Sequence, residues 1–338
     1  MVRIRRSREG SGEANYFASP KPGIRFIKSG CTRLDLVLGG GYALGRVVNI
    51  VGDKAVGKTL LAIEAASNFI RDYPKGRVWY CEAEAAFDES YAEALGMPVK
   101  RVKFRRFDTI EDVGEDLVKC IQWSKDHNGA PGLYIVDSLD ALGDRKAKAR
   151  AFGEQGWHLE KPKLMSELFK TFIQDLEESG ICLIFISQVR DKIGVTFGDK
   201  HSRSGGKALD FYASQIMYLS HLNQVSRTIK GQKRVVGVRV KAKNKKNKVG
   251  LALRDCEFII QFGYGIDNVR ANLEWLTELG RLEEVHLNKK TAPDLIATRV
   301  DERGISWEGV TDVAVRRAWL EIETSFLPKT RKYGNGLR

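Results

Sequence analysis

The segment from Gly52 to Thr59 has the residue types and spacing of a phosphate-binding loop. Its sequence, GDKAVGKT, fits the pattern G-x-x-x-x-G-K-[S/T] and lies between an apolar run and an amphipathic segment. In such a loop the glycines let backbone N–H groups surround phosphates, and the next helix adds the positive end of its dipole. Lys58 is expected to reach the β- and γ-phosphates of ATP, and Thr59 to ligate Mg²⁺. The predicted nucleotide-binding residues of this loop are Gly52, Asp53, Lys54, Ala55, Val56, Gly57, Lys58 and Thr59.

A second Mg²⁺ ligand is predicted at Asp137, which directly follows the apolar run 133–136. A carboxylate at the carboxyl end of a parallel strand beside the phosphate-binding loop can hold the metal's ligand shell. Asp137 and Ser138 could instead cap the start of a helix, because both side chains accept hydrogen bonds from first-turn N–H groups. The pattern favours the metal role.

Polar residues that could activate a water molecule or sense the γ-phosphate follow two further apolar runs. Glu82 and Glu84 lie at the end of the run 77–81, where a carboxylate can orient and deprotonate an attacking water. The residue types alone do not choose between these two acids. Gln188 follows the run 184–187, and a neutral amide there can sense the γ-phosphate and pass its presence to the next loop.

The elements that must position these side chains alternate between two patterns. Short β-branched runs predict strands, and longer stretches with apolar residues at helical spacing predict helices. The predicted strands are 47–51, 77–81, 133–136 and 181–186, and the predicted helices are 59–70, 110–124 and 164–178. Continuous apolar strands that alternate with helices are typical of a mainly parallel sheet covered on both faces. We therefore expect an α/β fold.

The pattern changes in the last third of the chain. Residues 227–249 and 257–262 are expected to form hairpin strands that extend the sheet, and a helical, more acidic stretch follows from about Gly265. This stretch predicts a small α+β C-terminal domain. The predicted divisions are a basic N-terminal arm (1–23), an ATPase core (24–265), the C-terminal domain (266–326) and a basic tail (327–338).

The composition restricts the partners and the compartment. The 338 residues carry a formal net charge of +13, which favours a polyanionic partner, although any generally basic protein shares this property. The five cysteines form no C-x-x-C pair, so reduced thiols are expected in place of a disulfide frame or zinc site. No apolar run is long enough to span a membrane, and no apolar stretch follows the basic N-terminal residues. We expect a cytoplasmic protein.

Together these features resemble the RecA recombinase family over most of residues 24–265. The matching stretches include SGCTRLD at 29–35, IVDS at 135–138, and AE, FD and Y within 83–91. The longest is IFISQVRDKIGVTFGDKHSRSGGKALDFYASQIMYL at 184–219, whose pieces occur in the family's order and spacing. The resemblance implies a RecA-type P-loop core, ATP and Mg²⁺ as cofactors, and DNA-dependent ATP hydrolysis.

The resemblance also implies individual roles at the nucleotide. It assigns Glu84, not Glu82, as the base that activates water, and Gln188 as the γ-phosphate sensor. Asp88 and Tyr91 are expected to contact the adenine, Tyr91 by stacking on it.

Family members complete each ATP site with two lysines of a Lys-Asn-Lys motif from the next subunit. Two adjacent segments here fit that motif, 243–245 and 246–248. We favour Lys246 and Lys248, because Val249 and the apolar residues after it match the family better. The other interpretation is a solvated basic hairpin.

Two loops of the family line the filament axis and hold DNA. Here they correspond to about 152–163 and 189–207, which follow the strand ends at Asp137 and Gln188. Cationic groups interleaved with apolar ones suit a strand whose bases must remain readable, and glycine backbones can approach phosphates closely. Ordinary mobile surface loops would have similar charge. The predicted DNA-binding residues are Trp157, His158, Lys163, Arg190, Lys192, Ile193, Phe197, Arg203, Gly205, Gly206 and Lys207.

The function predicted from the sequence is a DNA-dependent ATPase that binds single-stranded DNA as an ATP-bridged helical filament. It would then promote homologous pairing and strand exchange with duplex DNA. One alternative is a ring-forming DNA-translocating ATPase, which the run 184–219 argues against. The other is a recombination accessory protein that uses ATP only to assemble, which the intact Lys58, Glu84 and Asp137 argue against.

Overall fold

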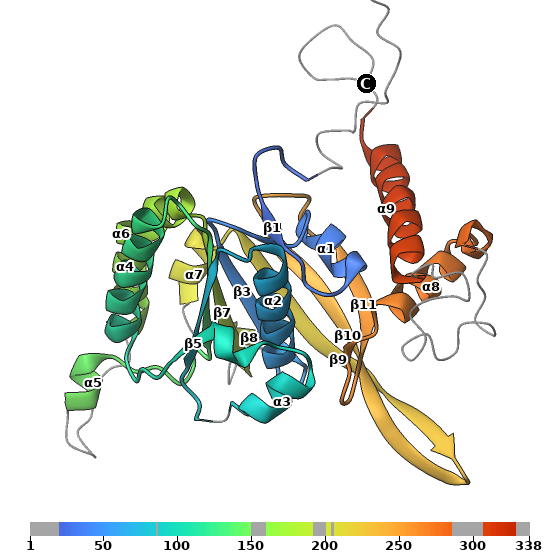
Figure 1. Cartoon of the computed structure of the whole chain (residues 1–338), viewed down its shortest axis with the longest axis horizontal. Coiled ribbons are helices and arrows are strands. Elements are labelled where there is room, and N and C mark those ends of the chain that lie inside the picture. The colour runs from blue at the N-terminus through green and yellow to red at the C-terminus, as the bar shows by residue number, and fades with distance from the viewer. Residues whose placement is uncertain are drawn as a thin grey trace, which may run out of the picture.

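A large central sheet organises the molecule (Figure 1). The computed structural model describes residues 20–85, 87–149, 160–191, 201–203, 206–285 and 307–328. Within them, ten strands form one sheet in the order β12-β11-β10-β9-β3-β7-β6-β4-β5, with β8 paired to β7. A short separate pair joins β1 (Phe26–Ile27) to β2 (Tyr42–Ala43).

The middle of the sheet is parallel. Its strands are β3 (Val47–Gly52), β4 (Arg77–Glu82), β5 (Val102–Arg105), β6 (Gly132–Asp137), β7 (Ile181–Asp191) and β9 (Gln215–Ile229). Every residue of β3 and β6 is buried, because helices cover both faces of the sheet. The predicted α/β class with a mainly parallel sheet is therefore confirmed.

Successive side chains of each strand point to opposite faces of the sheet and pack into two hydrophobic cores. In β3, Val48 and Ile50 pack with Leu61 of α2 (Lys58–Asp72) on one face. Val47 and Val51 point to the other face, which is covered by α4 (Ile110–Asp126) and α6 (Glu160–Ser179). The remaining helical elements before β9 are α1 (Thr32–Leu38), α3 (Glu89–Ala94), η1 (Val99–Arg101), α5 (Arg145–Ala149) and α7 (Gly206–Tyr212).

The far side of the sheet is antiparallel and includes a long projecting hairpin (Figure 1). β9 pairs with β10 (Gln232–Asn247), β10 with β11 (Asp255–Gln261), and β11 with β12 (Gly265–Ile266). β3 ends at Gly52 opposite Leu219, whereas β9 continues to Ile229.

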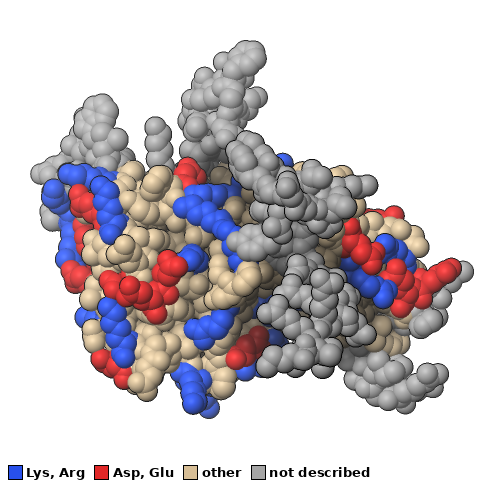
Figure 2. Space-filling view, turned by 90° about the horizontal axis from the view of Figure 1, so that it is seen from above, with Lys and Arg blue, Asp and Glu red and all other residues tan. Residues whose placement is uncertain are grey.

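The hairpin turn and the hairpin's charge are both distinctive. Lys230 and Gly231 have φ values of 48° and 74°, which is the backbone sign that a tight two-residue hairpin turn requires. Every charged residue between Phe211 and Arg254 is basic. On the face shown in Figure 2, by contrast, basic and acidic side chains are interspersed.

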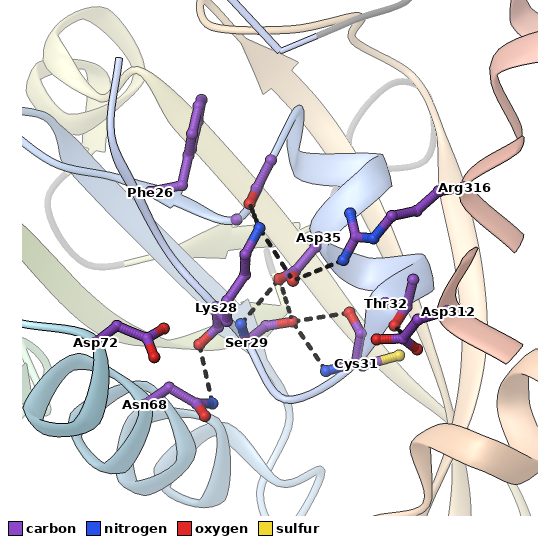
Figure 3. Close-up of polar contacts among 12 residues, drawn as sticks. Phe26, Lys28, Ser29, Cys31, Thr32, Asp35, Asn68, Asp72, Asp312 and Arg316 are labelled. Carbon is purple, nitrogen blue, oxygen red and sulfur yellow. Dashed lines mark hydrogen bonds and ion pairs between the residues drawn. The ribbon is translucent and has the colours of Figure 1, made fainter. Parts of the chain in front are cut away.

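The C-terminal helices pack on α1 and on the edge of the sheet. Apolar residues of α8 (Asn268–Glu278), η2 (Leu282–Val285) and α9 (Trp307–Phe326) form a third core. The carboxylate of Asp312 in α9 accepts a hydrogen bond from the side chain of Thr32 in α1 (Figure 3). It accepts another from the side chain of Asn268 in α8, so Asp312 ties α9 to both helices.

Asp35 forms a second link between α9 and the core. Its buried Oδ1 accepts hydrogen bonds from the backbone N–H and the Oγ of Ser29, both at 2.8 Å. Lys28 Nζ and a guanidinium nitrogen of Arg316 each lie 3.9 Å from Oδ2 (Figure 3). Burial raises the pKa of Asp35 to about 6, and the charge of Lys28 opposes that rise.

Two predicted boundaries were wrong. β7 does not end at residue 186 but continues to Asp191, because Val189–Asp191 pair with β8 (His201–Arg203). Both paired segments lie within the second predicted DNA-binding loop, 189–207. α6 begins at Glu160 instead of residue 164, so Lys163 lies in its first turn and not in a loop. Pro162 is compatible with that turn, because first-turn N–H groups have no acceptor within the helix.

The predicted domain divisions stay predictions. Most of the N-terminal arm and of the basic tail, and residues 286–306 of the C-terminal stretch, lie outside the described residues. Among the residues that are described, no helix is both long enough and apolar enough to cross a bilayer.

The raised pKa of Asp35 predicts a pH-dependent stability. Because this carboxyl binds its proton more tightly in the folded than in the unfolded chain, its contribution to the free energy of unfolding falls as pH rises from about 4 to 6. Asp35→Asn keeps an oxygen acceptor for Ser29 and removes the titration. We expect the variant to gain roughly 3 kcal/mol relative to wild type between pH 4 and pH 7. Urea unfolding across this range measures the difference, and a pH-independent difference would contradict the prediction.

Candidate nucleotide-binding site

The phosphate-binding loop connects β3 to α2. Gly57, which precedes the helix, has φ of 93°, and a Cβ atom there would lie 2.3 Å from Cδ1 of Ile260. The left-handed backbone at this position favours glycine. Lys58 is 9% exposed, and its Nζ donates to the carbonyl oxygen of Gly52 at 2.9 Å. Burial lowers the pKa of Lys58, and the charges of Asp137 and Glu84 oppose that change.

Three strand ends bring the other predicted polar groups together. Glu84 follows β4, Ser138 follows β6 and Gln188 lies in β7. The Oε1 atom of Glu84 accepts hydrogen bonds from Ser138 Oγ and, at 3.1 Å, from Gln188 Nε2. Glu82, the alternative base, is buried at the end of β4 with its carboxylate 3.5 Å from Arg106. This geometry favours Glu84 as the group that faces the nucleotide.

A cavity of about 410 Å³ opens over the loop, in the range typical of small-molecule sites. It is lined by Lys54, Ala55, Gly57, Lys58, Thr59, Leu60, Glu84, Tyr91, Asp137, Gln188, Val238, Ile260 and Phe262. The last three residues come from β10 and from the end of β11, and sequence reasoning missed them. They belong to no local motif, so only their alternation within strands could have suggested burial on this face.

Tyr91 and Asp88 have different positions at this cavity. Tyr91 lines it and is 44% exposed, so its ring is available for stacking. Asp88 is not among the described lining residues. Its carboxylate accepts a hydrogen bond from the backbone N–H of Tyr91 at 3.0 Å and caps the N-terminus of α3. Asp88 thus positions the helix that carries Tyr91.

Asp137 has a partner that the sequence did not suggest. Its Oδ2 accepts hydrogen bonds from Thr59 Oγ1 and from the hydroxyl of Tyr80, both at 2.8 Å. Burial raises the pKa of Asp137, and these two hydrogen bonds oppose the rise. The ring of Tyr80 is fully buried, 4.7 Å from the ring of Phe87.

Thr59 and Asp137 fit Mg²⁺ as a donor set. Both offer oxygen, the ligand atom that Mg²⁺ prefers, and the ion usually takes only one or two carboxylates beside water and substrate phosphates. Among the described residues, no three acidic, histidine or cysteine side chains lie together as a group that could hold a metal ion.

Lys246 and Lys248 lie away from this cavity. Their Nζ atoms donate to the carbonyl oxygen of Phe211, at 2.9 and 3.3 Å, beside a ring that is 69% exposed. The competing pair differs, since Lys245 Nζ lies 4.1 Å from the ring centre of Tyr218. None of the lysines of either candidate pair is among the described residues that line the cavity, so the choice of Lys246 and Lys248 stays a prediction.

Comparison with known proteins agrees with this geometry. A family model of the RecA N-terminal domain matches residues 12–267. The chain belongs to the RecA family. RecA proteins of Prochlorococcus marinus strains AS9601 and MIT 9301 are each 36% identical to it over 257 residues, which are 75% of this chain and 67% of theirs. RecA of strain NATL1A is 35% identical over 75% of this chain and 64% of its own length.

RecA-family proteins are DNA-dependent ATPases that act with ATP and Mg²⁺ in recombination and repair. Of the predicted DNA-binding residues, six lie outside the described residues: Trp157, His158, Lys192, Ile193, Phe197 and Gly205. Of the others, Arg190 lies opposite Ser202 in the β7–β8 pair, and Arg203 lies opposite Val189. Gly206 and Lys207 begin α7.

The hydrogen bond from Tyr80 to Asp137 predicts that replacing Tyr80 changes the Mg²⁺ concentration needed for nucleotide binding. Tyr80→Phe keeps the buried ring but removes one of the two donors that orient Oδ2 of Asp137. We expect the Mg²⁺ concentration for half-maximal nucleotide binding to rise roughly three- to tenfold, because one such hydrogen bond contributes about 1 kcal/mol. Fluorescent ADP titrated with Mg²⁺ measures this.

Tyr134→Phe is the matched control for that experiment. Tyr134 is also a buried strand tyrosine, but its hydroxyl donates to Asp116 at 3.0 Å, outside the cavity. Equal Mg²⁺ requirements in the two variants would show that Tyr80 does not act through Asp137.

Proposed function

We propose that this RecA-family chain hydrolyses ATP in a DNA-dependent manner in the cytoplasm, binds single-stranded DNA as an ATP-bridged filament, and promotes homologous pairing and strand exchange. The observation that carries the proposal is the meeting of Lys58, Glu84 and Gln188 at one cavity. Gln188 belongs to β7, the strand that leads directly into the second predicted DNA-binding segment. A γ-phosphate sensor and a DNA-binding segment therefore share one strand.

In the proposed reaction, Glu84 orients a water molecule and takes its proton as the oxygen attacks the γ-phosphorus. ADP leaves with the bridging oxygen, and inorganic phosphate is the second product. Lys58 offsets charge on the β- and γ-phosphates, and bound Mg²⁺, held by Thr59 and Asp137, would neutralise more of it. Ser138 holds the Glu84 carboxylate in place through its hydrogen bond to Oε1.

Lys246 and Lys248 would complete the site of the neighbouring subunit. Their position beside the exposed Phe211, away from their own cavity, supports this role. A nucleotide contacted by two subunits makes filament assembly depend on ATP. In this scheme ATP favours the DNA-holding state, and hydrolysis releases it.

The projecting β9–β10 hairpin supports duplex DNA as the second partner. Arg227 and Arg234 lie directly opposite one another near its tip, and like charges at opposed positions repel. A polyanion across the ribbon would relieve that repulsion, and a two-stranded ribbon fits the major groove of duplex DNA.

Glu84→Gln tests the proposed function. We expect it to lower DNA-stimulated ATP hydrolysis by about 100-fold or more, because it removes the general base, while single-stranded DNA binding persists. Steady-state hydrolysis with and without single-stranded DNA measures the effect. Glu82→Gln is the control, since Glu82 faces Arg106, and it should retain hydrolysis within a few-fold. A wild-type protein that binds DNA without stimulated hydrolysis would instead be an accessory protein, and directional duplex unwinding would indicate a translocase.

Neutralising the hairpin tip tests the duplex partner. The triple variant Arg227→Gln, Lys233→Gln and Arg234→Gln should lower the salt dependence of duplex binding by about 0.9 in log–log slope for each phosphate that the hairpin no longer neutralises. Fluorescence anisotropy at several salt concentrations measures the slope. The control replaces the exposed Lys75, Lys100 and Lys103 with Gln. Equal slopes for the two triple variants would mean that the tip charges only protect an exposed ribbon from aggregation.

A further inference from the structure

A side chain extends the pairing of β6 with β7 beyond its backbone ladder. The parallel backbone pairing ends at Val136 opposite Phe185. The next contact is the N–H of Leu139, which donates to the carbonyl oxygen of Ile186 at 2.9 Å. Beyond it, Oδ2 of Asp140 accepts the N–H of Gln188 at 2.7 Å.

Gln188 is therefore held on three sides. Its backbone pairs with Gly52 at the end of β3, the first residue of the phosphate-binding loop. Its N–H donates to Asp140, and its side-chain amide donates to Glu84 at 3.1 Å. Only the last of these contacts is one that a γ-phosphate oxygen can replace without breaking the sheet.

The hydrogen bond between Asp140 and the N–H of Gln188 lies between the chain segments that lead to the two predicted DNA-binding segments. The residues after Asp140 lead through α5 toward the first predicted DNA-binding segment, and those after Gln188 pair with β8 in the second. The bond thus joins the two parts of the chain that lead into these segments. A backbone N–H held by a carboxylate is also a stronger contact than one between neutral groups.

We propose that Asp140 is a positioning residue that couples the nucleotide at Gln188 to both DNA-binding segments, a role that rests on the proposed function. When ATP binds, the side-chain amide of Gln188 breaks its hydrogen bond to Glu84 and donates to the γ-phosphate instead. Asp140 meanwhile keeps the backbone N–H of Gln188 bonded to the turn after β6. The displacement then moves both segments together. Without Asp140 the shift passes along β7 to the second segment alone and no longer reaches the turn after β6, which leads to the first.

The test compares Asp140→Ala with Asp140→Asn. Alanine removes the acceptor and the charge, whereas asparagine removes only the charge and can still accept from the N–H of Gln188. The readout is the ratio of single-stranded DNA dissociation constants measured with ADP and with a non-hydrolysable ATP analogue. Asp126→Ala is the control, an exposed helix-end carboxylate that accepts only from the side chain of Gln122 among the bonds described.

We expect Asp140→Ala to lower that ratio about tenfold, within the usual range of coupling between two sites, with nucleotide affinity unchanged within about twofold. Asp140→Asn should restore the ratio to within about twofold of wild type. Amide hydrogen exchange at Gln188 should accelerate in the alanine variant only. Should Asp140→Ala fail to fold, Asp140→Ser serves in its place, because the serine side chain is shorter than that of aspartate and does not reach the N–H of Gln188.

Three outcomes would overturn the proposal. The first is an unchanged ratio in the alanine variant despite faster exchange at Gln188. The second is an asparagine variant as defective as alanine, which would make the charge, and not the hydrogen bond, responsible. The third is unchanged exchange at Gln188 in the alanine variant. A wild-type chain without nucleotide-dependent DNA affinity would instead refute the proposed function, and exchange at Gln188 with each nucleotide would still test the coupling across Asp140.

Discussion

The parallel pairing of β4, β6, β7 and β3 is the constraint on which the nucleotide site depends. Parallel strands end at the same edge, so residues far apart in the chain become neighbours there. The register sets Glu82 opposite Asp137 and Gly52 opposite Gln188. A slip of one residue in any of these pairs would turn a side chain of the candidate site to the opposite face of the sheet.

Polar groups at this edge form hydrogen bonds with one another, although only Tyr80, Asp137 and Ser138 among them are buried. Asp137 accepts hydrogen bonds from Thr59 and Tyr80, and Glu84 accepts them from Ser138 and Gln188. Asp140 accepts one from the backbone N–H of Gln188. A buried carboxylate without such donors would gain a proton and lose its value to a metal ion or a water molecule. The hydrogen bonds from Thr59 and Tyr80 oppose the rise in the pKa of Asp137 that burial causes. Together with the others they connect β4, β6 and β7 at this edge.

The antiparallel half of the sheet and the C-terminal helices contribute in a different way. β10 and β11 supply apolar side chains that wall one side of the cavity, and the β9–β10 hairpin carries basic charge beyond the sheet. α9 is held to α1 through Asp312 and through the ion pair of Arg316 with Asp35. These contacts join the C-terminal helices to the helix that lies just before the phosphate-binding strand.

The sequence by itself determined the phosphate-binding loop, because Gly52 to Thr59 are contiguous and their backbone requirements are local. Its apolar runs also determined a mainly parallel α/β sheet, and the family resemblance pointed to Glu84 over Glu82. Only the tertiary structure decided that Tyr80 donates to Asp137, that Asp140 accepts from the N–H of Gln188, and that Phe262 lines the cavity. It also decided that β7 runs on to residue 191. Each of these depends on strand order and register between distant segments, which no local pattern of residue types encodes.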